Sequence, residues 1–330
     1  MVHEMHAAVV EEHDGPFRIS RLPVPVPDAG QVLVRIHASG VNPLDTKIRA
    51  GKADHARHPL PAILGMDLAG TVEAIGPGVT QFGVGDEVWG MTGGVGGHQG
   101  SLAEFAAVDA ALLAPKPAKL SMREAAAIPL IFITAWEGLV DRANLQAGQT
   151  VLVQGGAGGV GHMAIQIARA RGSRVYATDR PGRADYLAGL GAVPIDRDMA
   201  VEDYVALHTG GRGFDVVYDT VGGSVLDASF RAVKRFGHVV SALGWGTHAL
   251  APLSFRAATY SGVFTLLPIL TGEGCAHHGE ILREAAKLAE AGLLSPMLDE
   301  RRYTLETVAE AHGAIADRSA RGKLVVDIVR

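Results

Sequence analysis

A glycine-rich turn at residues 155–161 constrains the fold of this chain more than any other feature of its sequence. The turn contains Gly156-x-Gly158-x-x-Gly161 and lies between an apolar, strand-like run and a helix-like segment that starts at Val160. In this setting the first glycine permits a tight turn, the second lets the backbone approach a diphosphate, and the third lets the helix pack closely on the strand. The unpaired N–H groups and the positive dipole end of the helix would face the phosphates. The motif predicts a dinucleotide-binding site, with a purely structural turn as the alternative.

The sequence around the turn alternates between short apolar runs and helical segments. Such alternation is typical of βαβ units, which form a parallel sheet with helices on both faces. Strands are expected at 151–154, 174–178, 193–195, 214–219 and 238–243, and helices at 160–171, 183–190, 201–207 and 224–233. The predicted fold class is therefore α/β, with a doubly wound parallel sheet of the Rossmann type.

The first 120 or so residues have a different texture, with short apolar runs divided by Gly and Pro, and this pattern predicts a β-rich domain. Ser121 and Glu124 form a capping box that opens an alanine-rich helical segment and marks the entry to a second domain. Further on, we expect a strand at 262–267, helices at 279–292 and 305–315, and a last strand at 323–329. The simplest topology is an inserted one. Residues 1–122 and 290–330 then form the β-rich domain, and residues 123–289 form the Rossmann domain.

Composition excludes several classes of partner. The 330 residues include 30 Lys and Arg against 35 Asp and Glu, a formal net charge of −5, without a basic block, so neither nucleic acid nor an anionic membrane is an expected partner. The longest apolar runs fall short of the roughly 18 residues that a membrane span needs. The N-terminus lacks the pattern of a signal peptide, and we expect a cytoplasmic protein. A single cysteine, Cys275, excludes an intrachain disulfide and a four-cysteine zinc lobe.

The end of the second predicted strand bears on the choice of cofactor. An acidic residue there can bind a ribose 2′-hydroxyl, as Asp179 could, whereas arginine accommodates a 2′-phosphate. Arg180, Arg183 and Arg197 cluster at the same edge of the sheet and could pair with a phosphate dianion. We expect NADPH as the cofactor, and Asp179 leaves NADH possible.

Motifs along the whole chain resemble the medium-chain dehydrogenase/reductase superfamily, and within it the zinc-independent quinone oxidoreductase branch. The matching stretches are Ser39-Gly-Val-Asn-Pro-Leu-Asp45, Gly65-Met-Asp-Leu-Ala-Gly-Thr-Val72, Gly83-Val-Gly-Asp-Glu-Val88, Ser101-Leu-Ala-Glu-Phe105, Thr134-Ala-Trp136, the glycine turn and Gly322-Lys-Leu-Val325. The resemblance implies a β-rich, partly barrel-like, GroES-like substrate domain, an inserted Rossmann domain, and an active site in the cleft between them.

Departures from the zinc alcohol dehydrogenases indicate a reaction without metal. Asn42 stands where those enzymes have a metal-binding cysteine, and Gly65-Met66-Asp67 stands where they have Gly-His-Glu. We therefore expect no metal site. Without a Lewis acid, hydride transfer suits an acceptor that spreads the resulting charge, so the predicted substrate is a small-molecule quinone or α,β-unsaturated carbonyl.

The resemblance also suggests which residues form the site. It implies that Asn42, Asp45 and Thr134 lie near the nicotinamide, with Gly244 on the loop after the last Rossmann strand. Lys47 stands where related quinone reductases often carry Tyr, so it could polarise the acceptor oxygen or protonate the product, or simply point to solvent. The catalytic candidates are Asn42, Asp45 and Lys47. Cofactor contacts are predicted for Asn42, Thr134, Gly156, Ala157, Gly158, Gly159, Val160, Gly161, Asp179, Arg180, Arg183, Arg197, Gly244 and Lys323.

Two other functions remain open at this point. An enoyl thioester reductase would use the same hydride chemistry with a different pocket. A nucleotide-binding protein with little turnover, in a crystallin-like or redox-sensing role, would also keep the glycine motif. The apolar segment 261–267 resembles the edge strand through which this family dimerises, so a homodimer is expected.

Overall fold

The computed structural model describes residues 4–328 and divides the chain into two compact units. Residues up to 130 and from 266 onward form one unit, here called the β-rich unit, and residues 131–265 form the other, the Rossmann unit. The Rossmann unit is inserted into the sequence of the β-rich unit. The predicted fold class, a Rossmann sheet inserted into a β-rich domain, is confirmed.

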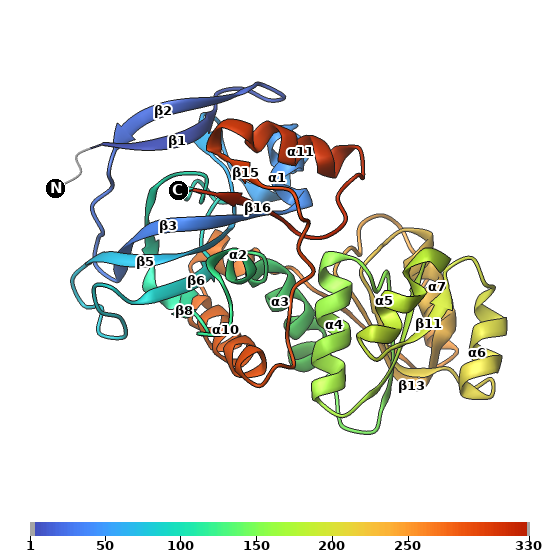
Figure 1. Cartoon of the computed structure of the whole chain (residues 1–330). Helices are drawn as coiled ribbons and strands as arrows, with labels where there is room; N and C mark the ends of the chain where they lie inside the picture. The colour runs from blue at the N-terminus through green and yellow to red at the C-terminus, as the bar shows by residue number, and fades with distance from the viewer. Residues whose placement is uncertain (1–3, 329–330) are drawn as a thin grey trace. The chain divides into compact units, whose positions relative to one another are not determined.

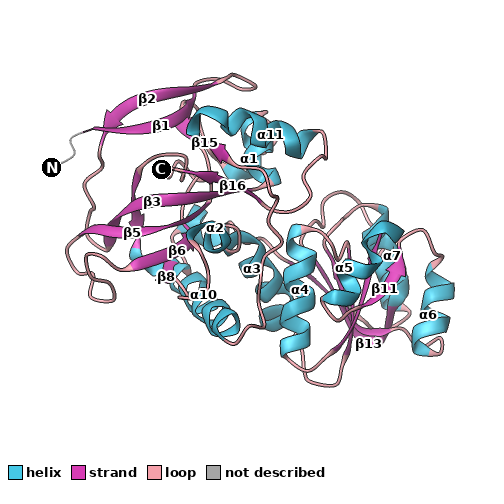
Figure 2. Cartoon of the chain, viewed as in Figure 1, coloured by secondary structure: helices cyan, strands magenta, loops and turns pink. Residues whose placement is uncertain are grey.

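The Rossmann unit contains a six-stranded parallel sheet with the order β11-β10-β9-β12-β13-β14. The order reverses between β9 and β12, which is the switch point where doubly wound sheets bind ligands. Figure 2 shows the helices flanking these strands. The strands are β9 (Thr150–Gln154), β10 (Arg174–Asp179), β11 (Val193–Asp196), β12 (Phe214–Asp219), β13 (Val233–Ser241) and β14 (Thr259–Gly262). The helices are α3 (Pro129–Trp136, which starts in the β-rich unit), η3 (Glu137–Arg142, a π-helix), α4 (Gly159–Ala170), η4 (Pro181–Arg183), α5 (Ala184–Gly189), α6 (Val201–Thr209), α7 (Ser224–Ala232) and α8 (Ala251–Ser254).

The apolar residues of this sheet are buried on both faces, as expected for a parallel sheet. On one face, Leu152 and Val217 pack with Tyr204, Phe230 and Leu253 from α6, α7 and α8. The other face meets α4 and α5, whose Ile165 and Leu187 side chains lie beside Ala177 at the glycine turn. Burial on two faces explains why the strands read as continuous apolar runs.

The β-rich unit contains two sheets, visible on the blue-to-cyan side of Figure 1. A seven-stranded sheet has the order β15-β16-β3-β5-β6-β8, with β7 also paired to β3, and a three-stranded sheet has the order β2-β1-β4. Large side chains such as Ile36, Leu68, Trp89 and Met91 are fully buried. The strands are β1 (Glu4–Val10), β2 (Phe17–Pro23), β3 (Gln31–Val41), β4 (Ala62–Ile63), β5 (Asp67–Ile75), β6 (Glu87–Met91), β7 (Phe105–Asp109), β8 (Leu113–Pro115), β15 (Tyr303–Thr304) and β16 (Leu324–Asp327). The helices are α1 (Pro43–Arg49), η1 (Asp54–Ala56), η2 (Ala110–Leu112), α2 (Met122–Ala126), α9 (Leu267–Thr271), α10 (Cys275–Glu290), η5 (Leu305–Thr307) and α11 (Val308–Ala316).

Two short α-helices of this unit, α1 and α2, begin with capping boxes. The predicted box at Ser121 and Glu124 opens α2, with the Ser121 N–H donating to Glu124 Oε2 at 2.9 Å. A second box, which the hydrophobic pattern does not predict, opens α1, where Asp45 accepts from the Asn42 N–H at 2.7 Å and Pro43 occupies the first helical turn. The box fixes Asn42 at the junction of β3 and α1.

The boundaries between the two units differ from the expected ones. They fall after residues 130 and 265, not 122 and 289, so α9 and α10 belong to the β-rich unit. Helix α10 packs against β8 and η2 so closely that a side chain at Gly279 would place its Cβ 2.5 Å from the Ala111 carbonyl oxygen. The Ala118 N–H also donates to Glu290 Oε1 at the end of α10. These close contacts, and not the local sequence texture, assign α10 to the β-rich unit.

The strand expected at 262–267 is displaced. The sixth strand, β14, covers Thr259–Gly262, and its last residue pairs with Ser241, where β13 ends. No ladder partner on β13 remains beyond Gly262, and α9 begins at Leu267 with a proline in its first turn. The chain leaves the sheet earlier than its apolar sequence suggests.

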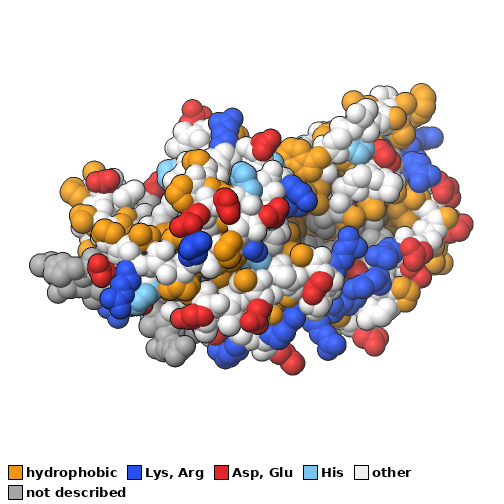
Figure 3. Space-filling model, turned by 90° about the horizontal axis from the view of Figure 1, so that it is seen from above, with side chains coloured by type: hydrophobic (Ala, Val, Ile, Leu, Met, Phe, Trp, Pro, Cys, Tyr) orange, Lys and Arg blue, Asp and Glu red, His pale blue; other side chains and the backbone are white. Residues whose placement is uncertain are grey.

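Two surface properties bear on the expected partners. Within residues 4–328, no helix combines the length and apolarity that crossing a bilayer requires. On the face shown in Figure 3, acidic and basic side chains are interspersed.

Candidate active site

Two glycines of the turn at the end of β9 have no room for a side chain. A Cβ at Gly161 would lie 2.1 Å from the Gly155 carbonyl oxygen, and one at Gly156 would lie 2.7 Å from Ala177 Cβ. Gly155 has a φ of +75°, a conformation that favours glycine. The turn is therefore closed around its own backbone, as the motif predicts.

The first turn of α4 meets the requirements of a diphosphate site. Gly158 is the N-cap of α4, and no side chain caps it. The first N–H groups of a helix lack intrahelical partners, so those after Gly158 are available to a phosphate. The residues present fit the diphosphate of a dinucleotide.

The neighbouring loops at the switch point are held by polar residues that the sequence analysis did not single out. The Thr220 hydroxyl donates to the Gln154 carbonyl at 2.6 Å and joins the ends of β12 and β9. Asp219, fully buried, accepts from the Gly222 N–H at 3.0 Å and from the Ser241 hydroxyl at 2.7 Å. Their place at the carboxyl ends of parallel strands is the signal that could have identified them.

Asp179 is bound to the glycine turn itself. Its Oδ2 accepts from the Ala157 N–H at 2.9 Å, and its Oδ1 accepts from the Arg180 N–H at 2.8 Å. The Arg197 N–H donates to the Asp179 carbonyl at 3.0 Å, which places Arg197 beside the end of β10. Arg180 and Arg197 are exposed and Arg183 is half-buried, so three guanidinium groups follow the ends of β10 and β11.

Thr134 and Gly244 lie elsewhere in the Rossmann unit. Thr134 is buried, its Oγ1 lies 3.0 Å from Thr265 Oγ1, and its carbonyl accepts from the Tyr218 hydroxyl at 2.6 Å. Gly244 follows β13, where a Cβ would lie 2.1 Å from the Tyr260 hydroxyl. Their predicted contacts with the nicotinamide remain predictions.

A buried charge network, formed by Asn42, Asp45, Asp67 and Lys323, lies in the β-rich unit. The Lys323 ammonium donates to Asn42 Oδ1 at 2.5 Å and to the Val41 carbonyl at 3.0 Å. Asn42 Nδ2 donates to Asp67 Oδ2 at 2.9 Å, and Asp67 Oδ1 accepts from the Leu130 N–H at 2.9 Å. Strands β3, β5 and β16 meet here, because β3 pairs with both others.

The electrostatics of this network are dominated by burial. Desolvation raises the pKa of Asp45 to about 7 and that of Asp67 to about 6, and the Lys323 charge opposes both shifts. Desolvation also lowers the pKa of Lys323, against the attraction of the two carboxylates. One ammonium balances only one carboxylate, so the second carboxyl group is the one that burial drives toward the protonated form.

The network joins three of the predicted site residues, Asn42, Asp45 and Lys323, and adds Asp67. Lys47 is not part of it. Lys47 lies on the exposed side of α1, whereas Asp45 lies on the buried side of the same helix. The ammonium of Lys323 points to Asn42, and its predicted contact with the cofactor remains a prediction.

Among residues 4–328, no cluster of three or more His, Cys, Asp or Glu side chains has the arrangement of a metal site. At the positions compared with the zinc enzymes, the side chains present are Asn42, Met66 and Asp67, and all three are fully buried. Asn and Met are outside the usual zinc ligand set of Cys, His, Asp and Glu.

Comparisons with known proteins agree with this architecture. Residues 28–118 match a family model described as an alcohol dehydrogenase GroES-like domain, and residues 190–326 match one described as a zinc-binding dehydrogenase. The chain is 36% identical to 2-methylene-furan-3-one reductase of Solanum lycopersicum over 92% of this chain and 74% of that protein. It is 32% identical to the quinone oxidoreductase of Homo sapiens over 98% of this chain and 97% of that protein.

A solved structure is similar over the whole fold. The crystal structure of an alcohol dehydrogenase superfamily protein from Novosphingobium aromaticivorans has a TM-score of 0.97 and 63% sequence identity, and the match covers 98% of this chain and 100% of that one. The two reductases are thus similar to this chain in sequence over most of its length, and the solved structure is similar to it in fold. The chain belongs to the medium-chain dehydrogenase/reductase superfamily and is an oxidoreductase of that family.

Proposed function

We propose that this protein uses NADPH to reduce a small quinone or α,β-unsaturated carbonyl compound without zinc. The observation that carries the proposal is the contact between the Lys323 ammonium and Asn42 Oδ1. Asn42 stands where zinc alcohol dehydrogenases have a metal-binding cysteine. The ammonium bound to the only acceptor atom of the Asn42 side chain repels a second cation. The same ammonium also attracts the buried Asp67 carboxylate.

Without a Lewis acid, the acceptor must stabilise the charge that it receives. Quinones and enones do so because the added charge is delocalised in a quinolate or enolate, whereas hydride addition to a simple carbonyl leaves a localised, strongly basic alkoxide. The names of the two curated relatives, a furanone reductase and a quinone oxidoreductase, support this choice of acceptor. When bound, the reduced nicotinamide would supply the hydride.

The residues that would hold the cofactor lie around the glycine turn. The N–H groups after Gly158 would bind the diphosphate, and Arg180, Arg183 and Arg197 would bind a 2′-phosphate. Both carboxylate oxygens of Asp179 already accept N–H groups of the protein, from Ala157 and Arg180. These hydrogen bonds favour NADPH over NADH, because the Asp179 carboxylate is directed toward the glycine turn that it stabilises and not toward a ribose 2′-hydroxyl.

The residues at the start of α1 would serve the acceptor. Lys47 is exposed and can offer a proton or a positive charge to an oxygen atom, whereas the buried Asn42 amide can orient a neighbour but cannot act as a base. Asp45 is buried beside it and, at neutral pH, lies near its titration point. We propose Lys47 as the group nearest the developing oxyanion.

The test is steady-state oxidation of NADPH and of NADH by a panel of benzoquinone, naphthoquinone, alkenones and an enoyl-CoA, with and without a chelator. We expect turnover with quinones or enones, a higher kcat/KM with NADPH, and no loss of rate after chelation. Turnover with enoyl-CoA alone would assign the protein to the enoyl thioester reductases. NADPH binding without turnover on any acceptor would contradict the proposal and favour a binding role.

A homodimer in the cytoplasm is also part of the proposal. Strand β14 is at one end of the six-stranded sheet, so its outer edge can pair with the same strand of a second copy. Light scattering of the purified protein should give twice the chain mass of 34.5 kDa. A mass of one chain at micromolar concentration would contradict this expectation.

A further inference from the structure

Both backbone groups of Lys323, its N–H and its carbonyl, form hydrogen bonds with the segment 297–299. The Lys323 N–H donates to the Met297 carbonyl at 2.7 Å, and the Asp299 N–H donates to the Lys323 carbonyl at 3.0 Å. The preceding Gly322 is so close to this segment that a Cβ there would lie 2.5 Å from the Met297 oxygen. Residue 323 is thus fixed against the segment 297–299.

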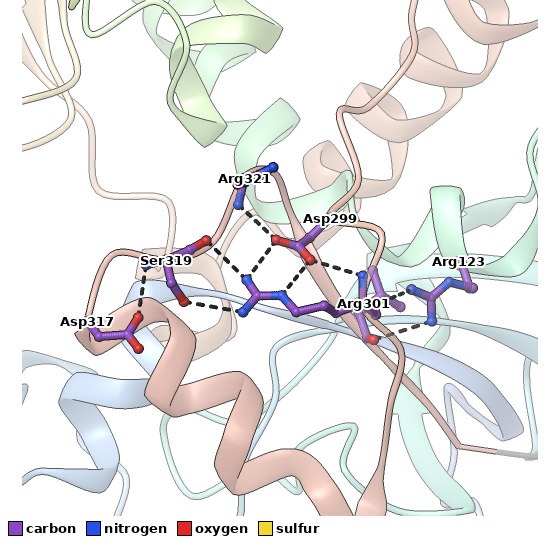
Figure 4. Close-up of polar contacts among 7 residues, drawn as sticks. Arg123, Asp299, Arg301, Asp317, Ser319 and Arg321 are labelled. Carbon is purple, nitrogen blue, oxygen red and sulfur yellow. Dashed lines mark hydrogen bonds and ion pairs between the residues drawn. The ribbon is translucent and has the colours of Figure 1, made fainter.

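A polar cluster secures that segment. In this cluster, here called the Arg301 clasp, Asp299 accepts from Arg301 Nε and Nη2, both at 2.8 Å, and from the Arg321 N–H at 2.8 Å. Figure 4 shows the Arg301 side chain between Asp299 and Ser319, which it also contacts at 3.2 Å. A two-point pairing of guanidinium and carboxylate fixes orientation as well as distance. The clasp therefore ties residues 299–301 to residues 319–321, immediately before Lys323.

From this anchored position the Lys323 side chain is directed inward. It is only 7% exposed, and its ammonium donates to Asn42 Oδ1 and to the Val41 carbonyl. Two of the three ammonium donors are therefore used on the junction of β3 and α1. In this arrangement the ammonium forms hydrogen bonds to buried groups of the protein itself.

The two partners of Asn42 determine which way its amide points. An ammonium can only donate, so it requires the amide oxygen, and the Asp67 carboxylate can only accept, so it requires the amide nitrogen. Each partner excludes the flipped amide. Removal of the Lys323 charge would leave the oxygen without its donor and leave Asp67 and Asp45 without a buried counter-charge.

We propose that Lys323 is a positioning residue, which fixes the Asn42 amide at the start of α1 together with Asp67 and thereby acts on turnover and not on cofactor affinity. The kinetic part of this inference rests on the proposed function. Asn42 is the N-cap of the helix that also carries Asp45 and Lys47, and its backbone N–H donates to Asp45, so a displacement of residue 42 would reach the first turn of that helix. If Lys323 instead bound the cofactor directly, its replacement would weaken the affinity for NADPH.

The sequence provides a direct probe of the amide. The chain contains two asparagines, Asn42 and Asn144, so protein labelled with ¹⁵N only in asparagine side chains gives two amide groups in a ¹H–¹⁵N spectrum. Asn144 lies in the other unit and serves as an internal reference. This measurement needs neither substrate nor turnover.

The variants are Lys323→Met, Lys323→Arg and, as a control, Lys287→Met, which removes an exposed lysine of α10 that pairs with Glu284. We expect Lys323→Met to shift or broaden the Asn42 side-chain signals, with Asn144 unchanged. Its kcat should fall by about 100-fold, the order expected when a reacting group is displaced by about 1 Å. The Kd for NADPH, measured by fluorescence titration, should stay within about twofold of wild type, a change of less than about 0.5 kcal/mol.

Rescue by the conservative variant separates positioning from general stability. Lys323→Arg keeps a buried cation with several donors and should restore most of the turnover and a wild-type pH profile of kcat. If Lys323→Met does not fold, Lys323→Met combined with Asp67→Asn removes both charges of the pair. In that variant no charged side chain fixes the orientation of the Asn42 amide, so turnover should remain low.

Three results would overturn the inference. They are unchanged Asn42 signals in Lys323→Met, a wild-type kcat in that variant, and a loss of NADPH affinity of tenfold or more with kcat retained. If the wild-type protein has no turnover with any acceptor, the proposed function fails. The positioning role is then decided by the asparagine spectrum alone.

Discussion

The glycine turn of the Rossmann unit and the buried charge network of the β-rich unit are both fixed in place, but the first is formed by backbone and the second by side chains. The glycine turn is built from backbone, and at Gly156 and Gly161 it leaves no space even for a Cβ. The charge network is built from side chains, with Lys323, Asn42 and Asp67 in a chain of hydrogen bonds that no backbone motif announces. Gly156 and Gly161 of the turn tolerate no added atoms, whereas the network depends on the hydrogen bonds that Lys323 and Asp67 form with Asn42.

The contrast predicts which changes each site can survive. At Gly156 and Gly161 the chemistry of a new side chain does not matter, because even a Cβ would collide, at Gly161 with backbone and at Gly156 with packed side chains. In the network, size matters less than the balance between donors and acceptors, because a buried group without its partner costs more free energy than the pair contributes. The four predictions below test this difference, from the largest expected effect to the smallest.

The largest effect is expected for Gly161→Val. The new Cβ would meet the Gly155 carbonyl oxygen at 2.1 Å, so the turn must open to accept it. We expect the Kd for NADPH to rise by at least about 100-fold, which corresponds to about 2.7 kcal/mol. Gly189→Ala in α5 is the matched control, since a Cβ at that position would have no atom within 4 Å. An unchanged Kd in Gly161→Val would mean that the turn is not the diphosphate site.

Next in size is the combined replacement of Arg180, Arg183 and Arg197 by Gln. Each guanidinium can give a charge-assisted hydrogen bond to a 2′-phosphate, worth about 1.5–3 kcal/mol when well formed. Because these residues are at least partly exposed, we expect a loss of about 10- to 100-fold in NADPH affinity overall. Affinity for NADH, which lacks the 2′-phosphate, should change little. Equal losses for both cofactors would contradict the assignment of the arginines.

The third prediction concerns the dependence of stability on pH in Asp45→Asn. Burial raises the pKa of Asp45 to about 7 in the folded protein, so this group favours folding most at low pH. Its contribution is lost as pH rises through about 7, since the folded protein then holds a buried charge that the unfolded chain solvates. The unfolding free energy of the variant minus that of wild type should therefore increase from about pH 5 to about pH 8, by an amount on the order of 2 kcal/mol. Denaturant unfolding at several pH values measures it, and a constant or falling difference would show that Asp45 remains ionised throughout.

The smallest effect is expected for Arg301→Gln in the clasp. Arg301 holds the pKa of Asp299 well below its usual range, opposite in sign to the shift of Asp45, because a bonded cation outweighs desolvation there. The stabilisation is present above the unfolded pKa of about 4 and is lost as pH falls below it. We expect a loss of about 1 kcal/mol at neutral pH that shrinks in acid. Arg302→Gln is the control, as Arg302 is exposed and pairs with Asp327 outside the clasp. Equal thermal shifts for the two variants would show that the clasp has no special role.

The same contrast explains what could be predicted from the sequence. Gly156, Gly158 and Gly161 are at most five positions apart, and the strands and helices around them follow a regular period, so the Rossmann unit and its turn were predictable. Lys323 and Asn42 are separated by 281 positions, and only the pairing of β16 with β3 brings them together. Local spacing carries no information about such a contact.

Other differences have the same physical origin. The predicted domain boundary near residue 290 was displaced because α10 packs on β8 and η2, a contact decided at Gly279 and not by local composition. The strand predicted at 262–267 ends at Gly262 because β13 supplies no partner beyond Ser241. The role of Asp219 was not predictable from its local sequence because its partner Ser241 belongs to another strand. In each case the outcome depended on a contact with a residue far away in the sequence, which the local sequence does not reveal.

The most direct test of the central claim follows the hydride itself. NADPH carrying deuterium at C4 of the nicotinamide, on either face, would be used to reduce an alkenone with protein treated with a chelator and assayed for metal. We expect transfer of deuterium from one face to the β-carbon of the alkenone, at an undiminished rate in protein that contains less than a stoichiometric amount of zinc. Loss of activity on chelation with recovery on added zinc, or a product without deuterium at the β-carbon, would contradict hydride transfer without metal.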